Sequence, residues 1–164
     1  MMNRISSVCI ALSIAVLPAY IQAQAKLKEV NVYFMFLGTD GAHSDLLPLK
    51  RKVSATAPLV PAMEALLSDP SAEEQKKGYV SASYGAMKLV SAKINKGTAR
   101  IDFSREIKPD YNPGDLQTLA FESAVTKTAK QFPGVRKVVV CVNGMNEFGV
   151  GMTVDAPIAC PKIR

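Results

Sequence analysis

The sequence has no tryptophan, a single histidine and only three cysteines among its 164 residues. With one histidine, any Ser-His-Asp or Cys-His catalytic arrangement would have to use His43. There is no internal repeat, and the balance of 48% hydrophobic and 21% charged residues excludes collagen-like, low-complexity and wholly disordered chains. We therefore expect one globular domain with one hydrophobic core.

Residues 1–25 have the pattern of an export signal. Arg4 gives the positive start, Val8–Leu17 is an uncharged apolar stretch, and small residues precede a cleavage point that we place after Ala25. The alternative is a retained membrane anchor, but Pro18 and two glutamines dilute the second half of the apolar segment. We expect an exported protein, periplasmic or extracellular, with no transmembrane segment after cleavage.

The number and positions of the cysteines are consistent with an exported protein. Cys9 lies inside the leader, which leaves Cys141 and Cys160 in the mature chain. Two cysteines in an exported protein predict a disulfide, and the alternative is a pair of free, buried thiols. The net charge of +6 permits acidic partners without requiring them.

Hydrophobic periodicity predicts the order β-β-α-β-β-α-β. The expected strands and helices, in chain order, are 29–37, 49–54, helix 58–67, 90–94, 99–103, helix 115–131 and 135–142. Ser71 and Glu74 have the spacing of a capping box for a further short turn. Two helices on one face of a mixed sheet make a two-layer α+β sandwich. We expect one domain over 26–164, with a C-terminal tail (145–164) that holds a sixth strand near 150–154.

Several segments, in their order and spacing, resemble the GerMN domain, a module of sporulation, spore-germination and other exported bacterial proteins. The segments that carry the resemblance are 32–34, Arg51, 65–67, 88–90, 97–104, 126–131 and 143–144. One departure is Asp69, which stands where the family usually has a glycine before a proline. The resemblance implies an extracytoplasmic, non-catalytic interaction domain, similar in fold to ring-building modules. It implies no catalytic residue, no cofactor and no role in germination as such.

Asp40, His43 and Asp45 are the residues that a metal-dependent envelope hydrolase would use. They lie in a segment rich in turn formers, and no nucleophile is positioned by the sequence, so we favour a solvated loop without metal. A small-ligand binder with a pocket between sheet and tail is a further alternative.

Lys50 and Lys52 alternate onto one face of the second strand. Such lysines commonly protect a sheet edge from pairing with other strands. The competing interpretation is attraction of an anionic envelope polymer or an acidic protein. Nucleic acid is disfavoured by export and because no basic stripe alternates with aromatic residues.

Apolar side chains fall on both faces of the predicted sheet. Those expected to point away from the helices are Tyr33, Met35, Leu37, Val139 and Cys141. A large uncovered apolar surface usually marks an interface. We expect the tail from Met145 to Cys160 to cover part of this surface and a protein or envelope partner to contact the rest.

Overall fold

A computed structural model describes residues 26–38, 44–106, 114–146 and 159–162. The elements are β1 (Leu27–Leu37), β2 (Ser44–Ser54), α1 (Leu59–Leu67), α2 (Ala72–Lys76), β3 (Tyr79–Val80), β4 (Met87–Asn95), β5 (Thr98–Arg105), α3 (Gly114–Lys130) and β6 (Lys137–Val142). The predicted order and the α+β class are confirmed, and the capping box of Ser71 and Glu74 opens α2. The two-residue strand β3 has no counterpart in the prediction. The leader, Asp40, His43 and the expected strand near 150–154 lie outside the described residues.

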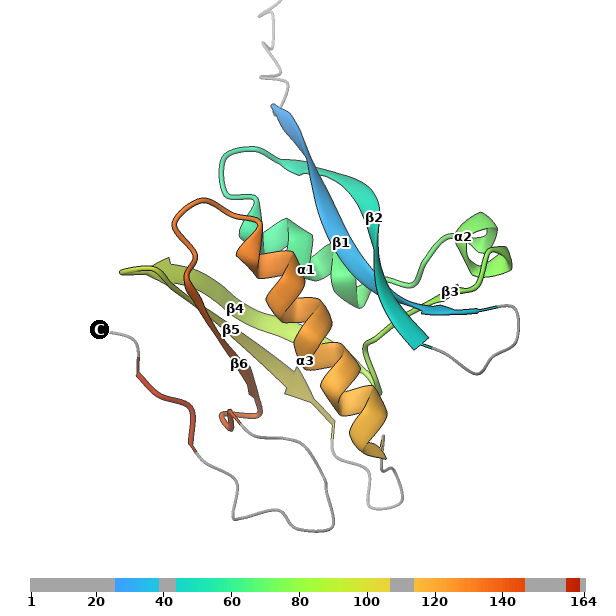
Figure 1. Cartoon of the computed structure of the whole chain (residues 1–164). Coiled ribbons are helices and arrows are strands. Elements are labelled where there is room, and N and C mark those ends of the chain that lie inside the picture. Colours follow the sequence, from blue (N-terminus) through green and yellow to red (C-terminus); the bar gives the residue numbers. More distant parts are fainter. Residues whose placement is uncertain (1–25, 39–43, 107–113, 147–158, 163–164) are drawn as a thin grey trace, which may run out of the picture.

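The strands form two sheets, which differs from the single mixed sheet that we expected. β1 lies between β2 and β3 in one antiparallel sheet, and β5 lies between β4 and β6 in the other. In the second sheet β5 pairs antiparallel with β4 and parallel with β6. Figure 1 shows α1 and α3 between the two sheets, and both helices contact strands of each.

The sheets stay separate because α3 occupies the edge of β1 where another strand would pair. The N–H of Tyr33 donates to Oγ1 of Thr128 at 3.2 Å, and the amide of Gln131 bonds both main-chain groups of Asn31. Farther along the same edge, β3 pairs with Met35 and Phe36. Several main-chain polar groups of this edge, including both of Asn31 and the N–H of Tyr33, are therefore satisfied without β4, β5 or β6.

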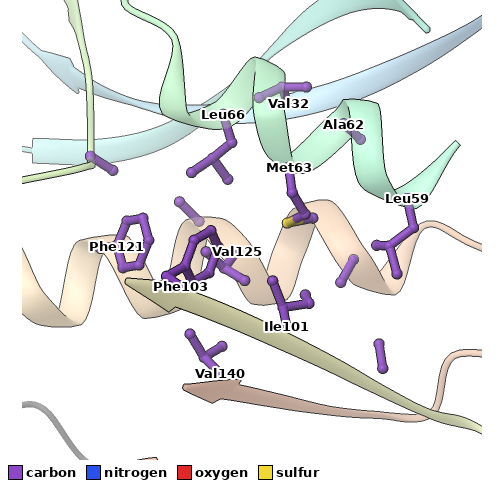
Figure 2. Packing of buried hydrophobic residues seen from close by; sticks show 14 of the residues in the cluster. Val32, Leu59, Ala62, Met63, Leu66, Ile101, Phe103, Phe121, Val125 and Val140 are labelled. Carbon is purple, nitrogen blue, oxygen red and sulfur yellow. The ribbon is translucent and has the colours of Figure 1, made fainter. Parts of the chain in front are cut away.

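The core lies where α1 and α3 meet the inner faces of both sheets (Figure 2). Alternation assigned Val30, Val32, Phe34 and Phe36 to the inside of β1. The first three are buried there, whereas Phe36 is half-buried and packs against Tyr79. Phe103 of β5 and Phe121 of α3 pack edge to face, with ring centroids 5.1 Å apart. Helical spacing places Met63 and Leu66 of α1 in the same cluster.

The Asn-Gly pair after β6 extends the second sheet through a side chain. Asn143 has a φ of 52°, and its own N–H donates to the carbonyl of Phe103. Its side-chain amide accepts from the N–H of Arg105 and donates to the Arg105 carbonyl, both at 2.9 Å. Asparagine tolerates the left-handed conformation better than most residues, which gives a physical reason for Asn143 at this position.

Candidate interaction surfaces

The first sheet has one face that points away from its fully buried residues Val30, Val32 and Phe34, here called the first outer face. The pairing register places on it Glu29, Asn31, Tyr33, Met35 and Leu37 from β1, and Leu46, Pro48, Lys50 and Lys52 from β2. All residues of the predicted interaction face thus share one surface. Alternation along a strand predicted which side chains share a face, and the register aligned the two strands.

The centre of the first outer face is apolar and partly open. Tyr33 and Met35 are half-buried, while Leu37 is 38% exposed. Leu46, opposite Met35, is also half-buried. Lys127 of α3 places its Nζ 5.5 Å from the centroid of the Tyr33 ring, which makes a cation–π contact at the helix side of the strip. Tyr33, Met35 and Leu46 pack against the core cluster with part of each side chain exposed, and Leu37 is the most exposed of the four.

The charged end of the first outer face combines two lysines with one carboxylate. Nζ of Lys50 lies 2.7 Å from Oε1 of Glu29, and this hydrogen bond raises the pKa of Lys50. Lys52 is exposed and sits directly opposite Glu29 in the register. Glu29 therefore reduces the positive charge that the two lysines present to a partner, a feature that the sequence analysis missed.

β2 is an edge strand, so its free side needs protection from other strands. Tyr33 directs its N–H toward α3 and away from β2, and its partner Pro48 therefore directs its own nitrogen to the free edge. Proline has no N–H to offer there. Pro48 and the two lysines together make this edge a poor template for strand addition. This agrees with the interpretation that Lys50 and Lys52 protect the sheet edge.

The second sheet has its own outer face, and part of the tail lies against it. Cys141 forms a disulfide with Cys160, whose N–H donates to the carbonyl of Gly144 at 2.8 Å. Met145 makes bridges with both Val142 and Ala159. Cys141 is fully buried as a result. Most of the tail, residues 147–158, is not among the described residues.

This arrangement corrects the single back surface that we expected. Val139 and Cys141 pair with Arg100 and Asp102 on the second sheet, whereas Tyr33 belongs to the first. The apolar residues assigned to one surface therefore lie on two, because the strands divide into two sheets. The described end of the tail, residues 159–162, lies against part of the second sheet.

Arg100 and Asp102 connect the tail to the outer face of the second sheet. Nη2 of Arg100 lies 2.7 Å from Oδ1 of Asp102, and Nη1 donates to the carbonyl of Pro161 at 2.6 Å. Burial opposes ionisation of Asp102, but hydrogen bonds from Arg100 and Ser91 outweigh it and lower the pKa of that carboxyl. The Asp102 carboxylate and the two cysteine sulfurs lie within 4.8 Å of one another. The sulfurs are joined in a disulfide and are not thiolates, so this donor set does not fit a metal ion.

Arg51 connects α2 to the first sheet, a contact that no local pattern in the sequence predicted. Its Nη1 and Nη2 donate to the two carboxylate oxygens of Glu74 at 2.8 and 2.7 Å, and its guanidinium lies 5.2 Å from the Phe34 ring centroid. The hydrogen bond from Arg51 lowers the pKa of Glu74 to about 2. The capping-box spacing revealed the local role of Glu74, but nothing in the sequence revealed its partner 23 residues away.

The alternative sites receive limited support. Of the hydrolase residues, Asp45 is exposed on β2, and Asp40 and His43 are outside the described residues.

A pocket of about 350 Å³ opens between the start of α1, the end of β4 and the residues after α3. Apolar side chains such as Leu59, Ile94 and Phe132 line it, and no titratable group does. It is not the sheet–tail pocket of the small-ligand alternative, which involves tail residues outside those described, and its lining has no group for acid–base chemistry.

In the described part of the chain, no helix is long and apolar enough to span a membrane. Among the same residues, Asp102 with the two cysteines is the one cluster with the spacing of metal ligands.

Two sheets with α1 and α3 between them define an α+β fold that solved structures share. The chain matches a structure titled tandem GerMN domains of the sporulation protein GerM from Bacillus subtilis, with 19% identity and a TM-score of 0.57. The match covers 92% of this chain and 49% of the other, so the chain spans about half of that structure. At this identity the likeness establishes the fold.

Two further structures are similar. The first GerMN domain of the same Bacillus subtilis protein matches with 24% identity and a TM-score of 0.49, covering 79% of this chain and 97% of that one. A putative lipoprotein from Clostridium perfringens matches with 23% identity and a TM-score of 0.47, covering 81% and 87%. No curated protein matches the chain.

The model of the Germane family, described as sporulation and spore germination, matches residues 31–147. Because this match spans most of the sequence, the chain belongs to the Germane family. The GerMN resemblance found in the sequence is thereby confirmed.

Proposed function

We propose that this protein is an exported, non-catalytic interaction module of the bacterial cell envelope that binds a partner protein through the first outer face. The observation that carries the proposal is the half-open apolar strip of Tyr33, Met35 and Leu37, with lysines at one end. An apolar centre with a charged rim is the usual anatomy of a protein interface. An anionic envelope component that binds the same lysines is the competing partner.

Membership of the Germane family supports this proposal, because the family is described by processes of the bacterial cell and not by a reaction. Export rests on the leader pattern of residues 1–25 and on the disulfide, which is typical of extracytoplasmic proteins.

In-cell photo-crosslinking tests the interface directly. A photoreactive residue is placed at Met35 or Leu37, and a matched control is placed at Val90, a 64% exposed apolar residue on β4 of the other sheet. We expect a discrete protein adduct from the first two positions and none from Val90. The same adduct from all three positions, or adducts with an envelope polymer alone, would contradict a protein interface on this face.

A further inference from the structure

Positive charge gathers on the outer face of the second sheet and on the tail that covers part of it. The register places Lys88 and Lys93 of β4, Arg100 of β5 and Lys137 of β6 on this face, and Lys162 follows the Pro161 carbonyl that Arg100 binds. Within the residues that the structure describes, Asp102 is the carboxylate that the register places among them. We call this surface the second outer face.

Positive charges outnumber negative ones on this face, although Lys93 also interacts favourably with the Asp102 carboxylate. Lys93 lies directly opposite Arg100 in the β4–β5 ladder. Like charges at such cross-strand positions repel each other. The carboxylate of Asp102 is already bonded by Arg100 and Ser91, and the ion pairs found among the described residues include neither Lys93 nor Lys137. A ligand that brings negative charge would relieve this repulsion.

The side chains that remain available on the second outer face favour phosphate over carboxylate as a ligand. Carboxylates are best bound by the planar fork of arginine, but the fork of Arg100 is taken up by Asp102 and the Pro161 carbonyl. Arg136 packs against Gly97 and donates to the Lys96 carbonyl. Lysine ammonium groups and the hydroxyl of Thr98, which pairs with Lys137, remain. Ammonium groups act as point charges, which suits phosphate.

The same face has little of what a protein or a bilayer would use. Val139 and Cys141, the apolar residues that the register places on it, are buried, and the exposed apolar residues nearby are single ones, Val90 at the irregularity of β4 and Met145 after β6. Among the described residues, the register places no aromatic side chain on it that could insert into a membrane or stack on nucleic acid bases.

We propose that the second outer face, centred on Lys93 and Lys137, binds a linear polymer that carries repeated phosphate groups. Neighbouring strands lie about 4.8 Å apart, and side chains on one face repeat about every 7 Å along a strand. This grid of lysines can contact several phosphates of an extended chain at once. The inference goes beyond the partner proposed for the first outer face and does not depend on it, because the two surfaces belong to different sheets.

Binding of fluorescently labelled long-chain inorganic polyphosphate to the purified protein, measured by anisotropy at several salt concentrations, tests the proposal. The test variant is Lys93→Glu with Lys137→Glu. The control is Lys77→Glu with Lys130→Glu, which makes the same change in net charge at exposed positions away from this face. We expect the test variant to bind about tenfold more weakly or worse, with a shallower salt dependence, and the control to bind like wild type.

A stability measurement separates lost binding from lost folding. Lys93→Glu places an acid opposite Arg100 but removes the attraction between Lys93 and Asp102, so we expect its melting temperature to stay close to that of wild type while polyphosphate binding falls. Equal loss of affinity in the test and control variants would overturn the proposal. So would binding of polyglutamate as tight as that of polyphosphate, or binding to anionic lipid vesicles without binding to polyphosphate.

Discussion

The side-chain amide of Gln131 pairs with both main-chain groups of Asn31, 100 residues away in sequence. Its Nε2 donates to the Asn31 carbonyl at 2.6 Å, and its Oε1 accepts from the Asn31 N–H at 2.8 Å. The amide thus takes the place that the backbone of a further strand would occupy. It binds the end of α3 to the edge of β1 and helps to keep the two sheets apart.

Replacing Gln131 by alanine should therefore destabilise the fold. Three hydrogen bonds are lost, two to the main chain of Asn31 and one to the Thr128 carbonyl. Each makes a net contribution of about 1 kcal/mol, so we expect the free energy of unfolding to fall by about 1–3 kcal/mol. Urea denaturation followed by circular dichroism measures this. Asn31→Ala is the matched control, because the bonds use only the main chain of residue 31. An equal loss in both variants would show that the amide pairing is not the cause.

Glu74→Gln should make stability less dependent on pH at low pH. The pKa of Glu74 in the folded protein is about 2, below the ordinary value of 4.5. A lowered folded pKa gives stability that is present above pH 4.5 and is lost as the pH falls toward 2. We expect wild type to exceed the variant by about 2 kcal/mol near pH 7 and by almost nothing at pH 2.

Glutamine preserves the capping box, so this comparison isolates the charged pair with Arg51. Glu73→Gln on the same helix provides the control, since its pair with Lys76 is exposed on both sides. We expect that variant to track wild type from pH 7 to pH 2 in urea denaturation. A wild-type advantage over Glu74→Gln that persists at pH 2 would refute the assignment of the pKa to this pair.

Removal of the disulfide should destabilise the protein substantially. Cys141 and Cys160 are 19 positions apart, and closing a loop of this size contributes about 3 kcal/mol by restricting the unfolded chain. We expect Cys160→Ser to lose about that amount in urea denaturation. Dithiothreitol should bring wild type to the same level and leave the variant unchanged. If dithiothreitol left the free energy of unfolding of wild type unchanged, the result would contradict a stabilising disulfide.

Charge changes around Glu29 should alter the rate at which a partner binds the first outer face. Lys52→Glu removes a steering charge and should slow association, whereas Glu29→Gln frees Lys50 from its ion pair and should speed it. Both effects should shrink as salt is added, because exposed charges are screened. Stopped-flow association with the partner isolated by crosslinking gives the rates. On-rates that both variants leave unchanged would exclude electrostatic steering by this face.

Local patterns predicted the elements well. Alternation placed Val30, Val32 and Phe34 on the inner face of β1, and helical spacing placed Met63 and Leu66 in the core. The serine and glutamate of the capping box predicted the start of α2. These features depend on residues within one strand or one turn, so the sequence displays them directly.

Long-range pairing was the part that local patterns could not supply. The sequence predicted one sheet because strand propensity does not say which edge a strand joins. The sequence did not indicate that Gln131 and Thr128 bind the edge of β1, because polar residues on a helix usually face water. The ion pair of Glu29 with Lys50 was missed because it needs the register between β1 and β2. The clustering of Lys93, Arg100 and Lys137 likewise needs the register of three strands.

The sequence by itself determined the α+β class, the family and the cysteine pair that joins the tail to β6. Each depends on composition, on short periodicities or on segments in a fixed order. The tertiary structure alone decided that two sheets form, and therefore that the apolar strip and the lysine-rich face are separate surfaces. The reason is physical: the edge of β1 is closed by side chains from a helix about a hundred residues away, and no local pattern encodes that contact.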